Sequence, residues 1–183
     1  MKNVLLEQIP GRRHSHIVRF ALFFALVLFL FSTPVRAETH DAEHALKQKL
    51  VQWLEQGWSH KAGDPPFDFQ SKVGFFYSRS PSDVILFDEL DPNKTVHRSA
   101  ESHGAVWGKM LGGTNFTTSV IDGPHLVLSG DLAAATVIYR VNIQAADGVQ
   151  TADVIGNFVL RKGAEGWKII REHGSALPPQ KAK

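Results

Sequence analysis

The stretch NFVLRKGAEGWKIIREHGSA, residues 157–176, decides how this chain folds. Its Gly163–Gly166 segment predicts a short turn between two strands, and a connection this short requires the strands to be antiparallel. The second strand starts with the apolar Trp167 and Ile169. On the same alternating face it continues with Arg171, His173 and Ser175. The apolar half of this face is expected to fill the core, and the polar half to enter solvent or a cavity.

Further strands and helices are predicted outward from this hairpin. Turn residues separate strands at 115–122, 125–130, 132–145 and 149–161, and Asp147-Gly148 is the strongest hairpin signal among them. Upstream, apolar spacing and capping residues predict helices at 39–62, 67–77 and 99–111, with a short strand at 84–87. This order predicts an α+β fold in which a curved antiparallel sheet packs around three N-terminal helices. Such a cone-shaped fold leaves a hollow inside the sheet.

The first 37 residues are predicted to be a secretory signal peptide. GRRHSHIVR supplies a positive segment, and the apolar run Phe20–Phe31 is too short to span a bilayer comfortably. Small residues place the cleavage between Ala37 and Glu38. The alternative is an uncleaved N-terminal anchor, and only in that case do we expect contact with a membrane. The chain has no cysteine, which suits export to a bacterial periplasm or beyond the cell.

Composition and motifs exclude several classes of function. Without residues 1–37 the chain has 15 basic and 17 acidic residues, so no basic surface favours a nucleic-acid partner. The lack of cysteine excludes thiolate chemistry. His40 and His44 are spaced as a helical metal clip, but the sequence shows no third ligand beside them, and no metal site is predicted. No phosphate loop or nucleophile elbow occurs, and we expect no cofactor.

The hairpin resembles the SnoaL-like branch of the nuclear-transport-factor-2-like superfamily, which also includes ketosteroid isomerase. In that branch the last hairpin ends in Trp-x-Ile-x-x-x-His-x-Ser, and residues 157–176 fit this pattern. SGDLAAATV (129–137) and FDELDP (87–92) resemble two other strands of the branch. The resemblance implies a SnoaL-like domain at 38–177. Pro178-Pro179 predicts that the tail at 178–183 is disordered. Ile155 and Asn157 depart from the residues of many relatives, which puts the pocket chemistry in doubt.

The resemblance also implies that the concave face of the sheet lines a pocket. His173 is the first candidate for a general base or an orienting group. Asp88, Asp153 and Tyr77 match by type the proton shuttle and oxyanion donors of ketosteroid isomerase. Each has a structural alternative, such as a turn for Asp88 or an ion pair with Arg140 or Arg171 for Asp153. The candidate ligand-binding residues are Trp58, Trp107, Asn157 and Arg171.

Three functions stay open at this point. The first is binding of a small, largely apolar ligand in the conical pocket. The second is a cofactor-independent enzyme of isomerase, cyclase or epoxide-hydrolase type, and whether the chain is an enzyme is left open. The third is an oligomerisation module. A homodimer through the outer sheet face is expected with either of the first two functions, because apolar residues alternate on the face that is predicted to be outer: Val137, Tyr139, Val141, Val154, Phe158, Leu160 and Ile170.

Overall fold

The computed structural model of the protein describes residues 34–179. The chain divides into two units, Met1–Asp41 and Ala42–Lys183, and the architecture below is that of the second unit. The predicted signal peptide, apart from its last residues, and the end of the predicted tail lie outside the described residues. Within residues 34–179, no helix has both the length and the apolar character that crossing a membrane requires.

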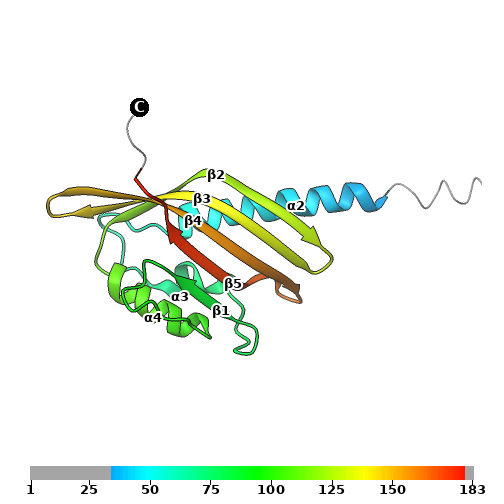
Figure 1. The fold of residues 1–183 in the computed structure, drawn as a ribbon, viewed down its shortest axis with the longest axis horizontal. Coiled ribbons are helices and arrows are strands. Elements are labelled where there is room, and N and C mark those ends of the chain that lie inside the picture. The colour runs from blue at the N-terminus through cyan, green and yellow to red at the C-terminus, as the bar shows by residue number, and fades with distance from the viewer. Residues whose placement is uncertain (1–33, 180–183) are drawn as a thin grey trace, which may run out of the picture. The chain divides into compact units, whose positions relative to one another are not determined.

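A curved sheet of five strands forms the largest part of the fold (Figure 1). The strands are β1 (Ile85–Asp88), β2 (Phe116–Ser129), β3 (Leu132–Ala145), β4 (Gly148–Gly163) and β5 (Gly166–Ala176). Their order across the sheet is β1-β5-β4-β3-β2. Strands β2 to β5 are antiparallel neighbours, as predicted, whereas β1 is parallel to β5. The long connection between β1 and β5 permits this parallel pairing.

The strand boundaries follow the predicted turns with one exception. Gly148 begins β4 and Gly166 begins β5, both with the positive φ that favours glycine. The strands predicted at 115–122 and 125–130 are instead one strand, β2. Its register against β3 shifts on both sides of Asp122, next to Gly123-Pro124. Proline cannot donate to the ladder, so the irregularity resembles a turn in sequence although the strand continues through it.

The helices differ more from the prediction than the strands do. Helix α2 (Pro34–Gln52) is followed by a π-helical turn at Trp53–Gly57. Helix α3 (Phe69–Lys72) is a single turn followed by a 3₁₀ turn at Gly74–Phe76. Helix α4 (Ala100–Leu111) comes after β1. An α+β fold with a curved sheet is therefore confirmed, but a set of three N-terminal helices is not supported.

Helix α4 begins and ends where its capping residues predict. The Ser99 hydroxyl accepts a hydrogen bond from the Ser102 backbone N–H at 3.2 Å, and Gly112 follows the last turn. A Cβ atom added to Gly104 would lie 2.3 Å from the ring of Phe69, so α4 and α3 pack without space for a side chain there. Figure 1 shows α3 and α4 together on one side of the sheet, beside β1.

An aromatic cluster joins the helices to the inner face of the sheet. Trp53 is 3% exposed, and its indole N–H donates to the Val73 carbonyl at 3.1 Å. The ring centroids of Phe76, Tyr77 and Phe158 all lie within 6 Å of the centroid of Trp53. Such contacts add to the burial of apolar area that holds the core together. Trp53 of this cluster also lines the cavity described next.

Candidate functional site

A β-bulge in β5 determines which side chains enter the hollow of the sheet. Leu160 of β4 pairs with Ile169, but the preceding Val159 pairs with Arg171, so Ile170 has no partner on β4. One extra residue reverses the alternation of every side chain after it. Trp167 and Ile169 therefore share the inner face with Glu172, whereas Arg171, His173 and Ser175 lie on the outer face.

The inner and outer faces of the neighbouring strands β3 and β4 also differ from the prediction, because they were assigned by their match to β5. Asn157 pairs with His173, and both lie on the outer face, whereas the prediction placed them in the pocket. The inner face of β3 and β4 is formed by residues that the sequence analysis placed outside: Val137, Tyr139, Val141, Val154, Phe158 and Leu160. That apolar face is covered by the protein's own helices, and it is not an exposed surface.

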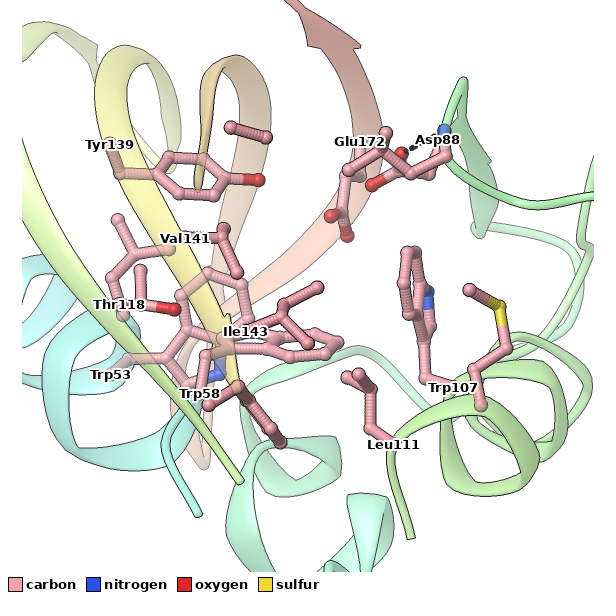
Figure 2. Close-up of a pocket in the computed structure, with 15 residues that line it drawn as sticks. Trp53, Trp58, Asp88, Trp107, Leu111, Thr118, Tyr139, Val141, Ile143 and Glu172 are labelled. Carbon is pink, nitrogen blue, oxygen red and sulfur yellow. Dashed lines mark hydrogen bonds between the residues drawn. The ribbon is translucent and has the colours of Figure 1, made fainter. Parts of the chain in front are cut away.

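A cavity of about 200 Å³ lies between the inner face of the sheet and the helices (Figure 2). Its wall is mainly apolar and includes Trp53, Trp58, Trp107, Leu111 and Ile143. The polar side chains in its wall are Asp88, Thr118, Tyr139 and Glu172. Figure 2 shows Asp88 and Glu172 side by side, with the hydroxyl of Tyr139 turned toward them across the cavity. The arrangement is thus an aromatic chamber with an acidic end.

Glu172 is the most perturbed acid of this end. It is 7% exposed, and the Tyr77 hydroxyl donates a hydrogen bond to its Oε2 at 2.7 Å. Burial raises the pKa of Glu172 to about 8; the hydrogen bond from Tyr77 opposes this rise, and the charge of Asp88 adds to it. At neutral pH Glu172 is therefore mainly a neutral carboxylic acid, which can donate a proton or a hydrogen bond.

Asp88 lies beside Glu172 at the end of β1. Its Oδ1 accepts a hydrogen bond from the Leu90 backbone N–H at 2.8 Å. Burial raises the pKa of Asp88, while this hydrogen bond opposes the rise. A Cβ atom on Gly174 would lie 2.6 Å from Oδ2 of Asp88, so the carboxyl group depends on a glycine at this position of β5. The two acids are held close together by the parallel pairing of β1 with β5.

Tyr139 completes the acidic end from β3. Burial raises the pKa of its hydroxyl well above the ordinary value of 10.0, and the charges of Asp88 and Glu172 add to the rise, so the hydroxyl stays protonated. Within residues 40–179, neither this hydroxyl, nor Oδ2 of Asp88, nor Oε1 of Glu172 makes a hydrogen bond to protein. Three oxygen atoms in the wall of an apolar cavity are thus available to a bound molecule.

Four of the predicted site residues lie on the outer face, away from this cavity. The guanidinium group of Arg140 holds Asp153 through two hydrogen bonds of 2.7 and 2.9 Å and lowers its pKa. Asn157 accepts a hydrogen bond from the Thr136 hydroxyl at 2.8 Å. Arg171 donates to the backbone carbonyls of Asp83 and Ile170. The imidazole of His173 packs against Phe87, with ring centroids 5.3 Å apart.

The other predicted residues lie at or behind the cavity wall. Trp58, Trp107 and Asp88 line it, and Tyr77 lies behind Glu172. The structure therefore brings Tyr77 and Asp88 to one place, but not Asp153. Sequence reasoning missed Glu172 and Tyr139, since both were assigned to the outer face. The sequence signal for the bulge was the pair of adjacent apolar residues Ile169-Ile170, because strict alternation would expose one of them. Both are buried in the structure. Among the described residues, no group of three His, Asp or Glu side chains could hold a metal ion.

No protein-family model and no curated protein matches the sequence. Solved structures do share its fold. A nuclear transport factor 2 (NTF2-like) superfamily protein from Salmonella enterica serovar Typhimurium matches with a TM-score of 0.60 and 18% identity, covering 78% of this chain and 96% of that chain. An NTF2-like protein with a cystatin-like fold from Novosphingobium aromaticivorans gives a TM-score of 0.61 and 9% identity, covering 81% and 94%.

A third solved structure is named as a candidate calcium/calmodulin dependent protein kinase II association domain, from Xanthomonas campestris. It matches with a TM-score of 0.52 and 21% identity, covering 70% of this chain and 83% of that chain. The structural neighbours of the chain are thus NTF2-like superfamily proteins, and the chain has their fold. Identities this low show the fold alone, because one fold hosts many unrelated activities.

Proposed function

We propose that this domain binds a small, flat, largely apolar molecule that carries a hydrogen-bonding oxygen. The observation that supports the proposal is the set of three oxygen atoms, on Asp88, Tyr139 and Glu172, that lie in the wall of a mainly apolar cavity and make no hydrogen bond to the described residues. These oxygen atoms are open to the cavity, since the described residues have His103 Nδ1 as their one fully buried side-chain atom without a partner. An oxygen of a ligand in the cavity could therefore form hydrogen bonds with them.

The size of the cavity limits the ligand to about one ring. Pockets for drug-sized ligands usually exceed about 300 Å³, whereas an engineered cavity of about 150 Å³ holds benzene. A cavity of about 200 Å³ thus suits a substituted ring. The neutral acid of Glu172 and the phenol of Tyr139 are both donors, so a carbonyl oxygen is the group they would recognise.

The proposal predicts that acetophenone binds more tightly than ethylbenzene, which has a similar shape but no oxygen. Replacing Tyr139→Phe is expected to weaken acetophenone binding by about tenfold, the effect of one hydrogen bond, and to leave ethylbenzene unaffected. Thermal shift and calorimetric titration measure both affinities. His173→Ala, on the outer face, is the matched control and should bind like the wild type. Equal binding of the two compounds, or no binding of either, would contradict the proposal.

A second candidate is an enzyme that uses proton transfer in the same cavity, as an isomerase, cyclase or epoxide hydrolase does. It is favoured by Glu172, whose pKa of about 8 suits a general acid or base near neutral pH, beside the more acidic Asp88. Exchange of solvent deuterium into the methyl group of bound acetophenone would separate turnover from binding.

The SnoaL-like branch of the superfamily remains our proposed placement of this chain, on the motif at residues 157–176.

We also propose that two copies associate through the outer face of the sheet. A shallow depression there contains the apolar side chains of Ile85, Phe87, Val127 and Val159, and Val127 is 70% exposed. One structural neighbour is named an association domain. Light scattering is expected to give the mass of a dimer, and Val127→Glu to give a monomer. Val149→Glu is the control, since Val149 is also 60% exposed but lies outside the depression. A wild-type monomer at micromolar concentration would refute the dimer.

Export to a bacterial periplasm or medium, with cleavage after Ala37, is proposed on the sequence of the first 37 residues. N-terminal sequencing of the protein from a periplasmic extract would test it, and an intact Met1 would count against it.

A further inference from the structure

A buried imidazole on α4 lies directly behind the cavity wall. His103 is 1% exposed, and its Nε2 accepts a hydrogen bond from the indole N–H of Trp107 at 3.0 Å. The same Nε2 lies 3.9 Å from Oε2 of Glu172. Trp107 and Glu172 both line the cavity. One nitrogen atom thus lies between an aromatic wall residue and the acid of the proposed ligand site.

The hydrogen bonds of His103 determine its tautomer. Because Nε2 accepts from an indole N–H, the proton of the neutral ring is on Nδ1. Burial lowers the pKa of His103 to about 3, so the ring is neutral at physiological pH. Among the described residues, Nδ1 of His103 is a buried polar atom without any hydrogen-bond partner. A group of this kind reduces stability and calls for another explanation.

Nε2 has one lone pair and two neighbours that can use it. The indole N–H of Trp107 occupies the lone pair in the structure. Protonated Glu172 is a second possible donor, since its O–H needs to move only about 1 Å closer to reach hydrogen-bond distance. Ionised Glu172 has only acceptor oxygens and cannot compete. The proton on Glu172 therefore decides whether Trp107 has a competitor for His103.

Other titratable groups surround this pair on every side. Tyr77 donates to Oε2 of Glu172, and Asp88 and Tyr139 face Glu172 from β1 and β3. His97 faces His103 with ring centroids 5.2 Å apart, and its Nε2 lies 3.1 Å from Oδ2 of Asp91. Both tyrosine hydroxyls have a pKa raised well above 10.0, so they do not ionise near neutral pH. Asp88 and Glu172 are the acids of this group that line the cavity.

We propose that His103 is a positioning residue that couples the proton on Glu172 to the position of the Trp107 indole in the cavity wall. While Glu172 holds its proton, it competes with the indole N–H for Nε2 of His103, and the Trp107 side chain can change its position in the cavity wall. Once Glu172 is ionised, Nε2 accepts from Trp107 alone, and the indole is fixed. No covalent bond changes, and the proton of His103 stays on Nδ1. The inference rests on the proposed function, because both coupled side chains belong to the proposed ligand site.

The test follows the indole N–H resonances of protein labelled with ¹⁵N-tryptophan, without any ligand, from about pH 6 to about pH 10. Trp107→Phe identifies the Trp107 resonance. In the wild type this resonance is expected to shift with a midpoint near 8, the pKa of Glu172. The shift should vanish in Glu172→Gln, which does not titrate, and in His103→Leu. It should return in His103→Gln, whose amide oxygen can replace Nε2 as acceptor.

Two outcomes would overturn the coupling. One is a wild-type Trp107 resonance that does not move near pH 8. The other is an unchanged titration in His103→Leu, as a direct electrostatic effect of Glu172 on the indole would give. Should His103→Leu fail to fold, His103→Asn serves instead, because its shorter side chain cannot reach the Nε2 position. His97→Asn controls for the neighbouring ring and should titrate like the wild type. Since no ligand is present, failure of acetophenone binding would leave this result intact.

Discussion

Raising the pH from about 6.5 to about 8 is expected to lower the free energy of unfolding by about 1 kcal/mol. Glu172 has a pKa of about 8 in the folded state, against an ordinary value of 4.5. Between these values the folded state holds a proton that the unfolded chain has lost, so stability falls by about 1.4 kcal/mol per pH unit. The stability that Glu172 contributes is fully present below pH 4.5, the ordinary pKa, and is lost as the pH rises through about 8, the pKa in the folded state.

His103 works in the opposite direction over part of this range. Its pKa is about 3 in the folded state, against an ordinary value of 6.5, so the unfolded chain binds the extra proton. Stability therefore rises with pH between these two values by a similar slope. From about 4.5 to about 6.5 the two effects cancel, and only above that range is the loss due to Glu172 visible. Urea denaturation at several pH values, followed by circular dichroism, measures the resulting profile.

The variant Glu172→Gln isolates the acid. The amide can still accept the hydrogen bond from Tyr77, but it cannot ionise. Its stability should rise from about pH 4.5 to about pH 6.5, because the effect of His103 is no longer offset by Glu172, and should not show the fall above pH 6.5. Glu165→Gln is the matched control, since the Glu165 side chain is 82% exposed, and it should follow the wild type. A wild-type profile that rises or stays flat between about pH 6.5 and 8, or one that is unchanged in Glu172→Gln, would show that Glu172 is not a buried neutral acid.

Truncating Trp53→Ala is expected to destabilise the domain by about 3–5 kcal/mol, the usual cost of removing a large aromatic side chain from a core. Trp53 is 3% exposed, contacts rings from the helical region and from β4, and ties its indole N–H to the Val73 carbonyl. The truncation would also enlarge the cavity, which has Trp53 in its wall. Urea denaturation monitored by far-ultraviolet circular dichroism gives the change.

Two further variants show how much of the stability lost in Trp53→Ala is due to the buried aromatic ring. Trp53→Phe keeps a ring but removes the hydrogen bond to Val73, so it should lose clearly less stability than the alanine variant. Phe75→Ala is the surface control, because Phe75 is 47% exposed, and it should change stability by no more than about 0.5 kcal/mol. If Trp53→Ala cost no more than Phe75→Ala, the aromatic cluster would not be the centre of the core.

The elements that local chemistry specifies could be predicted from the sequence. The hairpin at Asp147-Gly148 and the turn ending at Gly166 depend on glycines with positive φ, and helix α4 depends on its own Ser99 cap. The segment predicted as a helix at 67–77 was less well specified. It forms only a helical turn and a 3₁₀ turn, because its aromatic residues are fixed by the tertiary core and not by helical spacing.

The chemistry of the site was predicted less well, for one local reason. The apolar and polar residues of β5 alternate as expected up to Ile169, and the pattern then changes phase at Ile170. Period-2 reasoning carried His173 and Arg171 into the hollow and excluded Glu172. Asp88 and Tyr77 were identified because neither depends on this phase. A bulge is formed between two strands, so the sequence of one strand alone shows it only weakly.

The unpaired Ile170 gives β5 a further property. A single-codon deletion at this position would restore strict alternation and exchange the two sets of side chains beyond it, with no substitution elsewhere. The carboxyl group of Glu172 would then point outward, and the side chains of Arg171 and His173 would enter the cavity. Glu172 joins Asp88 in the cavity because the last strand is one residue longer than its neighbour requires.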